Sequence, residues 1–289
     1  MQALSQQQYE DFWRDGYIVI ENAVSAGQLR NLQDTFAGWV DESRTHDAPY
    51  GETINQRPRF DLEPGHTRDQ PALRRVNAPV EVSDAYFQAM ASSRMTACVT
   101  DLIGPNVKFH HSKINSKLPG GHTVVKWHQD FTFTPHTNDD VITALLMVDD
   151  VTSDNGPLEV DAGSHRGPLY SLWHDGVFTG AVDDGIAEEC QSRSELCAGP
   201  AGSVCLMHTR LMHGSKPNLS DRPRTLFICV YSADDAIPCS PSPMPNKYEG
   251  IMVSGERSNT VRSVSYEMEL PQLPASASFF DQQAKHTEN

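Results

Sequence analysis

The apolar positions of residues 1–45 predict a helix, a short strand and a second helix. Ser5 and Gln8 have the spacing of a capping box, and the apolar residues after them recur at helical spacing until Gly16. The next four residues, YIVI, predict a strand. Ser25 then caps a helix whose apolar positions 29, 32, 36 and 39 form one stripe. We expect this unit to pack on the rest of the chain through its apolar faces.

The pattern breaks at residues 46–80, which are polar and rich in Pro, Gly and Arg. This composition predicts an irregular loop rather than a helix or a strand. Long loops are uncommon in compact domains unless they serve a site, so this segment is a candidate lid. A helical pattern resumes over residues 83–103 and stops at Gly104-Pro105.

From Val107 onward the pattern changes to short β-type runs separated by turn residues. The runs are VKFHHSKIN, VVKWHQDF, VITALLMV, GSVCLMH and TLFICVYS. Several short strands with Gly and Pro between them predict a sandwich or barrel, here over residues 107–235. We expect a single domain over residues 1–289, with a weakly anchored tail at 275–289.

Composition and charge narrow the functional classes. The chain has 38% hydrophobic and 21% charged residues, which is typical of a globular protein. Its formal net charge of −15 argues against nucleic acid or an anionic membrane as a partner. We find no apolar run long enough to span a membrane and no signal peptide. Six cysteines without a C-x-x-C pair favour a reducing, cytoplasmic location.

The run VVKWHQDF places a histidine and an aspartate two positions apart. On a strand, His128 and Asp130 would project from the same face, either as a hydrogen-bonded pair or as two ligands of a metal. His213, at the end of a later predicted strand, supplies a third ligand. Two histidines and one carboxylate form the facial triad of non-haem Fe(II) oxygenases, which leaves positions for a co-substrate and O₂.

Arg224 follows His213 by 11 residues, and the turn formers between them allow the chain to return beside the metal strand. A guanidinium there could clamp a dicarboxylate, as 2-oxoglutarate would require. Arg210 and Arg222 are rivals for this role, although Arg222 lies in the turn itself.

Several motifs together extend this hypothesis over most of the chain: DGYIVI at residues 15–20, WHQDF at 127–131, NGPLEV at 155–160, GSHRG at 163–167, and HGS at 213–215 with Arg224. With them the chain resembles the phytanoyl-CoA dioxygenase family of Fe(II)/2-oxoglutarate oxygenases, which includes ectoine hydroxylase. The resemblance implies a mainly β fold with flanking helices around a double-stranded β-helix (jelly-roll or cupin-like) core. It also implies that the chain hydroxylates, or otherwise oxidises, an unactivated C–H bond of a small molecule. The enzyme would use Fe(II) as a cofactor and consume 2-oxoglutarate and O₂, with release of succinate and CO₂.

The resemblance further implies three contacts to 2-oxoglutarate. Asn115, Thr143 and Ser215 match positions at which members of the family similar to ectoine hydroxylase place an amide or a hydroxyl. Each of these side chains can donate a hydrogen bond to a carboxylate oxygen. Thr143 could equally be an ordinary strand threonine.

Candidate substrate residues flank the proposed ligands. His111 and Lys113 share the strand face of Asn115 and could bind an anionic part of a substrate, or form a solvated polar face. Phe131 and Phe133 follow the aspartate, with a threonine where ectoine hydroxylases carry an aromatic residue, so we expect a substrate other than ectoine. We see no Lys/Arg cluster for the phosphates of coenzyme A. An amino-acid-like or natural-product substrate is therefore favoured over an acyl-CoA.

Two other classes fit some of these residues. A cupin-type metal-binding protein without oxygenase activity, acting as a sensor or isomerase, would need the triad but no dicarboxylate clamp. An inert sandwich could hold His128 and Asp130 as a hydrogen-bonded pair and would bind no metal.

Overall fold

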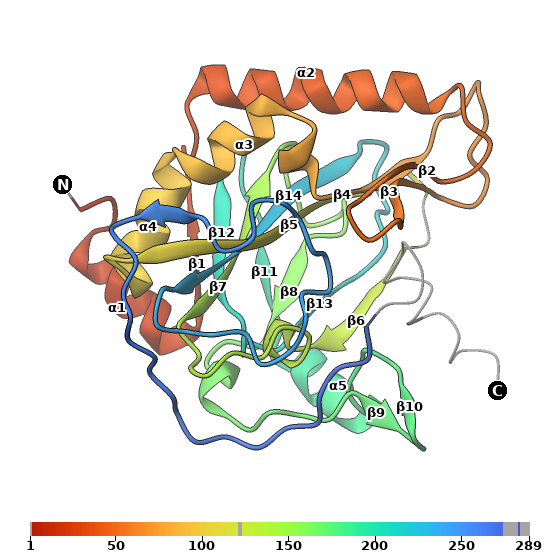
Figure 1. The fold of residues 1–289 in the computed structure, drawn as a ribbon. Helices are drawn as coiled ribbons and strands as arrows, with labels where there is room; N and C mark the ends of the chain where they lie inside the picture. Colours follow the sequence, from red (N-terminus) through yellow and green to blue (C-terminus); the bar gives the residue numbers. More distant parts are fainter. Residues whose placement is uncertain (1, 121–122, 274–282, 284–289) are drawn as a thin grey trace.

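Two antiparallel β-sheets form the body of the protein in the computed structural model, which describes residues 2–120, 123–273 and 283 (Figure 1). The predicted tail, 275–289, lies outside the described residues except for Gln283. The larger sheet has the order β1-β12-β7-β14-β5-β4-β3-β2, and β15 also pairs with β5. Its strands are β1 (Tyr17–Ile20), β2 (Tyr50–Glu52), β3 (Pro58–Leu62), β4 (Leu73–Asn77), β5 (Val107–Lys117), β7 (Val141–Met147), β12 (Val204–His208), β14 (Arg224–Ala233) and β15 (Met252–Ser254).

The smaller sheet has the order β11-β8-β13-β6. Its strands are β6 (Val125–His128), β8 (Leu158–Val160), β11 (Glu195–Cys197) and β13 (His213–Ser215). Between β5 and β14 the chain passes back and forth from one sheet to the other, and all pairings are antiparallel. This winding is a double-stranded β-helix, so the predicted fold class is confirmed. A separate hairpin of β9 (Trp173–His174) and β10 (Val177–Phe178) lies beside it.

Helices cover the outer face of the larger sheet. They are α1 (Gln6–Asp15), α2 (Ala26–Ser43), α3 (Asp84–Ala91) and α4 (Arg94–Ile103); α5 (Asp184–Ser192) lies near β9 and β10 (Figure 1). Phe12, Leu32, Tyr86 and Val99 from these helices join Phe227 of β14 in the main apolar core. That burial is the chief stabilising contribution of this layer.

The N-terminal predictions are confirmed in detail. Ser5 and Ser25 both cap their helices, each in a capping box with the glutamine three residues later. The helical pattern of residues 83–103 contains two helices rather than one. The break falls at Ser92 and Ser93, because the Ser93 hydroxyl accepts from the Thr96 backbone and caps α4.

The interpretation of residues 46–80 as irregular was wrong. This segment holds β2, β3 and β4, which extend the larger sheet beyond β5. The strands lack an apolar signature because their buried positions hold charges in pairs: Arg74 Nε lies 2.7 Å from Asp61, and Arg59 Nη2 lies 2.7 Å from Glu81. Buried charges need such partners, so the sequence looks polar although the strands are covered. The lid role of this segment stays a prediction.

Side-chain alternation along β5 divides the two faces of the larger sheet. Ile114 points outward into the helix-covered core, while Lys113, Asn115 and Lys117 line the interior between the sheets. On β14, which pairs with β5 over its whole length, Arg224 and Ile228 also face this interior. The space between the sheets therefore collects polar and charged side chains next to apolar ones.

Candidate active site

The three predicted metal ligands meet in the interior of the β-helix. His128 ends β6. His213 was expected at the end of a strand but begins β13, and the two histidines are directly paired across these strands. Asp130 Oδ1 lies 3.5 Å from His128 Nε2 and 3.6 Å from His213 Nε2. One ligand atom from each residue lies within 4.8 Å of the others. This is the spacing that a single bound ion would need.

The predicted strand VVKWHQDF is shorter than expected. β6 ends at His128, and Asp130 begins a 3-10 turn, η2 (Asp130–Thr132). Gln129 nevertheless keeps an extended backbone, with φ −117° and ψ 130°. The alternation of side chains therefore continues through it and brings His128 and Asp130 to one face.

Hydrogen bonds fix which atoms of the triad face the centre. His128 Nδ1 bonds the Lys126 carbonyl at 2.7 Å, and His213 Nδ1 bonds the Leu211 carbonyl at 3.0 Å. Both Nδ1 atoms are thus donors and both Nε2 lone pairs point inward. Thr143 Oγ1 donates to Asp130 Oδ2 at 2.6 Å, which leaves Oδ1 for the centre.

The charge state of the cluster follows from its burial and its neighbours. Burial opposes the ionisation of Asp130, but the adjacent His213 and His128 rings hold its pKa well below the usual range. Burial, reinforced by His128, lowers the pKa of His213 to about 4. An ionised carboxylate beside a neutral imidazole is the state in which such side chains bind divalent metals.

A pocket on one side of the triad contains all four predicted co-substrate residues. Arg224, Ser215, Thr143 and Asn115 line it together with the three ligands. Arg224 is buried at the start of β14, and its Nε and Nη2 donate to the Gly156 carbonyl. Thr143 is committed to Asp130, so its contact is with the metal ligand rather than with the far end of the pocket.

Lys117 is a further basic residue in this pocket and was not singled out from the sequence. It pairs directly with Arg224 across β5 and β14, and its Nζ donates to Ser215 Oγ at 2.7 Å and to the Lys216 carbonyl. Burial and the nearby Arg224 lower the pKa of Lys117 to about 6. The alternation that predicts Lys113 and Asn115 on one face extends to Lys117 and could have identified it.

The pocket fits 2-oxoglutarate on its own contacts. Arg224 and Lys117 form no ion pair with any residue that the structure describes, and the Asn115 amide oxygen is buried without a hydrogen bond there. Lys117, largely neutral while the pocket is empty, can take up a proton beside an anion. A buried guanidinium such as that of Arg224, without an ion pair, is costly unless an anion satisfies it. A dicarboxylate reaching from the triad to Arg224 would do so.

The rival residues lie elsewhere. Arg210 Nη1 pairs with Asp139 at 3.1 Å, outside the pocket. Arg222 is exposed in the turn before β14. His208, near His213 in the sequence, packs against Trp13 of α1, with ring centroids 6.0 Å apart. Of the three candidate arginines, Arg224 alone lines the pocket.

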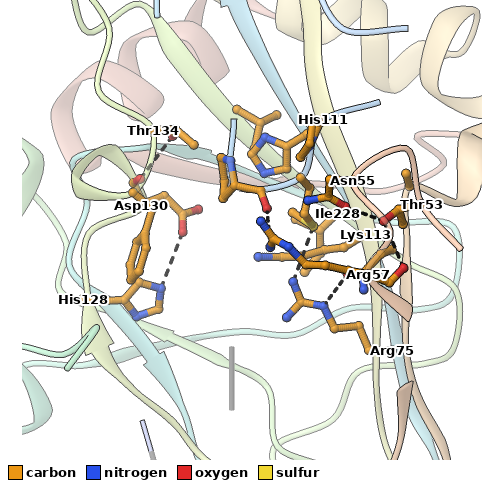
Figure 2. A pocket seen from close by; sticks show the side chains of 17 residues that line it. Thr53, Asn55, Arg57, Arg75, His111, Lys113, His128, Asp130, Thr134 and Ile228 are labelled. Carbon is orange, nitrogen blue, oxygen red and sulfur yellow. Dashed lines mark hydrogen bonds and ion pairs between the residues drawn. The ribbon is translucent and has the colours of Figure 1, made fainter. Parts of the chain in front are cut away.

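A second pocket opens on the other side of the triad (Figure 2). His111, Lys113 and Phe133, which we predicted near the substrate, line it with His128 and Asp130. Phe131 does not line it. Its ring is fully buried and packs against Tyr266, 5.2 Å between centroids, because η2 turns it away from the interior.

Most of the second pocket's wall was not predicted. It comes from the β2–β3 hairpin, from β4 and the residue after it, from the segment after η2, from β14 and from the loop before β15. The residues are Thr53, Asn55, Arg57, Arg75, Asn77, Ala78, Thr134, Ile228, Val230, Pro243, Met244 and Pro245. Arg57 and Arg75 belong to the segment that looked irregular in sequence. Its interpretation as a candidate lid allowed it near the site, but no pattern singled out these two residues.

Comparison with known proteins agrees with this geometry. The model of the family "Phytanoyl-CoA dioxygenase (PhyH)" matches residues 12–226. A probable alpha-ketoglutarate-dependent hypophosphite dioxygenase of Stutzerimonas stutzeri is 33% identical over 272 residues, covering 92% of this chain and 91% of that protein. An L-proline trans-4-hydroxylase of Streptomyces griseoviridis is 26% identical and covers 80% and 87%.

A solved structure is similar as well. The structure of EctD from S. alaskensis with 2-oxoglutarate and 5-hydroxyectoine is 27% identical, with a TM-score of 0.60, over 80% of this chain and 77% of that one. The resemblance predicted from the sequence motifs is thus confirmed. Within the described residues, no helix is both long and apolar enough to cross a bilayer.

Proposed function

The chain belongs to the phytanoyl-CoA dioxygenase family, and on that premise we propose that His128, Asp130 and His213 hold ferrous iron. It is an Fe(II)- and 2-oxoglutarate-dependent dioxygenase acting on a small molecule. When bound, iron and 2-oxoglutarate supply an oxidation by O₂ that yields succinate and CO₂ and oxidises an unactivated C–H bond of the substrate. The observation that carries the residue assignment is the convergence of His128 Nε2, His213 Nε2 and Asp130 Oδ1 between two pockets.

The protein's own contribution is orientation. The Lys126 and Leu211 carbonyls hold the two imidazoles in the tautomer that leaves Nε2 free to bind. Thr143 holds the carboxylate of Asp130 by one oxygen. All three ligands therefore approach from one side, and the remaining sides face the two pockets.

The pocket of Arg224 takes 2-oxoglutarate in this proposal. Arg224 and Lys117 receive the distal carboxylate; Arg224 is charged in the empty pocket, and Lys117 takes up a proton when the dianion binds. Ser215 lies between Lys117 and the triad and orients the lysine. Asn115 donates to the co-substrate from its amide nitrogen. A cupin-type sensor or isomerase would have no use for this arrangement, which favours the oxygenase.

The second pocket takes the substrate. Relatives are named for hypophosphite, L-proline and ectoine, all small compounds. We propose an amino-acid-like or natural-product substrate in preference to an acyl-CoA. We also propose a reducing, cytoplasmic location, because all six cysteines are free thiols.

Succinate formation tests the proposal. The protein is loaded with Fe(II) without oxygen, and air and 2-oxoglutarate are then supplied with a panel of small substrates. We expect succinate to rise with one substrate and to vanish in His213→Ala. In Arg224→Ala it should recover only at high 2-oxoglutarate. Wild type that forms no succinate, even uncoupled, and holds no more iron than His213→Ala would contradict the proposal.

A further inference from the structure

Four basic residues of β3, β4, β5 and the hairpin before β3 fall into two groups. Arg59 and Arg74 are buried in ion pairs with Glu81 and Asp61. Arg57 and Lys113 form no ion pair with any residue that the structure describes. Arg57 Nη1 donates to the neutral Pro243 carbonyl at 3.2 Å. The paired group stabilises the sheet extension, whereas the second group faces the pocket beside the triad.

Arg75 joins Arg57 and Lys113 in this pocket. Its Nε donates to Asn77 Oδ1 at 2.9 Å, and its Nη2 lies 3.4 Å from Met244 Sδ. In Figure 2 these three cations stand on one side of the pocket, and His128 and Asp130 stand on the other. Among the described lining residues Asp130 is the one acidic side chain, and the proposed metal ion would neutralise its negative charge.

We propose that Arg57, Arg75 and Lys113 bind the anionic head group of a small substrate, a phosphonate or a carboxylate, and hold its carbon atoms against the metal centre. The inference rests on the proposed function, which puts the substrate in this pocket. Guanidinium groups suit such oxyanions because their donors match two oxygens at once.

The size of the substrate follows from the position of the cations. Lys113 borders both pockets and lies close enough to Asp130 for the two charges to interact. The anionic group and the reacting C–H bond must therefore occupy the same pocket. In an acyl-CoA the phosphates are far from the acyl carbons, so these cations do not serve it.

The remaining wall suits a short carbon skeleton. Ile228 and Val230, which pair with Lys113 and His111 across β14 and β5, and Phe133 give apolar contacts, and Met244 closes the pocket beside Arg75. Thr53 and Asn55 add hydrogen-bonding groups from the hairpin. An anion with a short apolar body satisfies the pocket, whereas a cationic substrate would be repelled by it.

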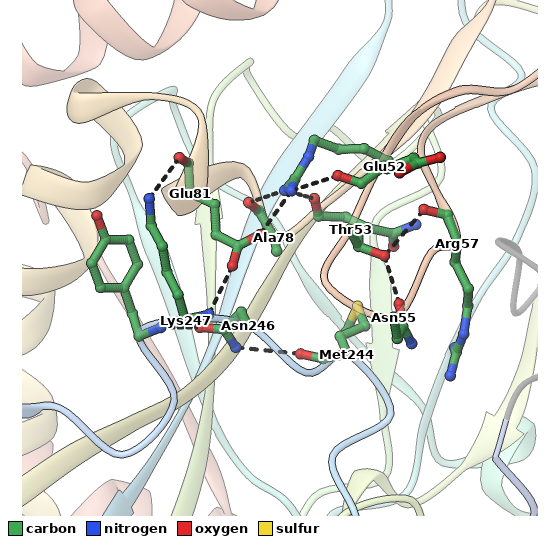
Figure 3. Close-up of polar contacts among 12 residues, drawn as sticks. Glu52, Thr53, Asn55, Arg57, Ala78, Glu81, Met244, Asn246 and Lys247 are labelled. Atoms are coloured by element: carbon green, nitrogen blue, oxygen red, sulfur yellow. Dashed lines mark hydrogen bonds and ion pairs between the residues drawn. The ribbon is translucent and has the colours of Figure 1, made fainter.

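Polar contacts centred on Glu81 hold the hairpin that carries Arg57 in place (Figure 3). Glu81 Oε2 accepts from Arg59 Nη2 at 2.7 Å, and Glu81 Oε1 accepts from the Lys247 backbone at 2.7 Å. Arg59 also donates to the Glu52 carbonyl at 2.9 Å. One carboxylate thus ties the hairpin to the loop that contains Met244. Both walls are held in place before substrate arrives, which reduces the entropy cost of binding.

Calorimetry with matched probes tests the proposal without turnover. The protein is loaded with Fe(II) and saturating 2-oxoglutarate under anaerobic conditions, so that anions cannot enter the co-substrate pocket. It is then titrated with propylphosphonate, butyrate, butyramide and propylamine, which share a short chain and differ in head group. We expect one or both anions to bind and the neutral and cationic probes to bind at least about tenfold more weakly.

Variants locate the binding. Arg57→Gln and Arg75→Gln should each weaken the anion by about 10- to 100-fold, and Arg57→Lys should restore part of the loss. Arg30→Gln removes the same charge from an exposed position on α2 and should change nothing. Melting temperatures identify any variant that fails to fold, and in that case Arg57→Lys against wild type carries the comparison.

Equal binding of butyramide and butyrate would overturn the inference, and so would anion binding that is unchanged in both glutamine variants. The preceding titration of 2-oxoglutarate into the iron-loaded protein reports on the proposed function separately. If wild type binds no 2-oxoglutarate, the proposed function fails; if it binds 2-oxoglutarate but no anion, only the substrate class fails.

Discussion

The two pockets that meet at the triad are built from different parts of the chain. The co-substrate pocket uses β5, β6, β7, β8, β13 and β14, all of them strands of the β-helix. The substrate pocket shares Lys113, His128, Asp130 and Ile228 with it but takes Arg57, Arg75 and Met244 from outside the β-helix. The β-helix thus holds the groups proposed to carry out the reaction. The hairpin and the loop outside it hold the groups proposed to select the substrate.

The cations of the two pockets also differ in their surroundings. Arg224 and Lys117 are buried next to each other, and burial lowers the pKa of Arg224 to about 10 and that of Lys117 to about 6. In the substrate pocket Arg75 is buried as well, but Arg57 and Lys113 are partly exposed. Leaving the co-substrate pocket empty therefore costs more free energy, whereas a ligand can enter and leave the more exposed substrate pocket.

Removing a ligand that both pockets share should give the largest effect. Asp130→Ala takes away the carboxylate between the two histidines, so we expect iron binding to fall by more than about 100-fold, beyond what outer-shell changes cause. Metal analysis after dialysis measures this directly. Thr143→Val is the graded control and should cost about 10- to 100-fold, since the carboxylate remains but is no longer held. Iron retained at wild-type level in Asp130→Ala would contradict the triad.

Arg224→Ala should affect the co-substrate pocket alone. Loss of a buried charged donor should weaken 2-oxoglutarate by about 10- to 100-fold. Binding of the anionic probe in the other pocket should not change. Arg222→Ala, at an exposed position two residues away, is the matched control. Equal losses in both pockets would show that the two are not separate.

Lys117 makes 2-oxoglutarate binding depend on pH. Its pKa is about 6 without the co-substrate, so it is mostly neutral at pH 7. The bound dianion raises that pKa, so binding above pH 6 takes up a proton, and affinity falls as pH rises. Calorimetry at pH 7 in buffers of different ionisation enthalpy should give close to one proton taken up. Lys117→Met should abolish the uptake; uptake that persists in this variant would assign the proton to another group.

Glu81→Gln should produce the smallest effect, confined to the substrate side. The amide keeps a hydrogen bond to Arg59 but loses the charge, so the hairpin is held less firmly. We expect anion binding to weaken about fivefold, ~1 kcal/mol, with 2-oxoglutarate affinity unchanged. Lys247→Gln keeps the backbone donor to Glu81 and is the control. A larger loss for 2-oxoglutarate than for the anion would contradict this division.

The alternation of side chains along single strands explains which site residues could be predicted from the sequence. Alternation along β5 placed His111, Lys113 and Asn115 on one face, and the same rule, continued, would have reached Lys117. Alternation also brought Asp130 beside His128, although the strand ends between them. Arg224 was found because a short turn follows His213. The expected return beside the metal strand is wrong in detail: the turn carries the chain from β13 in the smaller sheet to β14 in the larger one, where Arg224 faces the interior between the sheets.

The added wall could not be predicted in this way. β3 and β4 are strands whose buried positions hold Arg59, Asp61, Arg74 and Arg75, so they show no apolar alternation. Their ion pairs join residues 13 to 22 positions apart, and no local rule signals them. Phe131 was misplaced for a related reason, since the turn at η2 redirects its ring toward Tyr266, 135 residues later.

The sequence by itself determined the helix caps, five strands of the β-helix (β5, β6, β7, β12 and β14), the placement of Asp130 beside His128, and the arginine eleven residues after His213. These depend on spacings of two to eleven residues, which backbone geometry converts directly into shared faces. Only the tertiary structure decided that Arg57, Arg75 and Lys113 share a pocket. That meeting depends on which distant strands pair and on which charges find partners there, and both are settled by long-range packing.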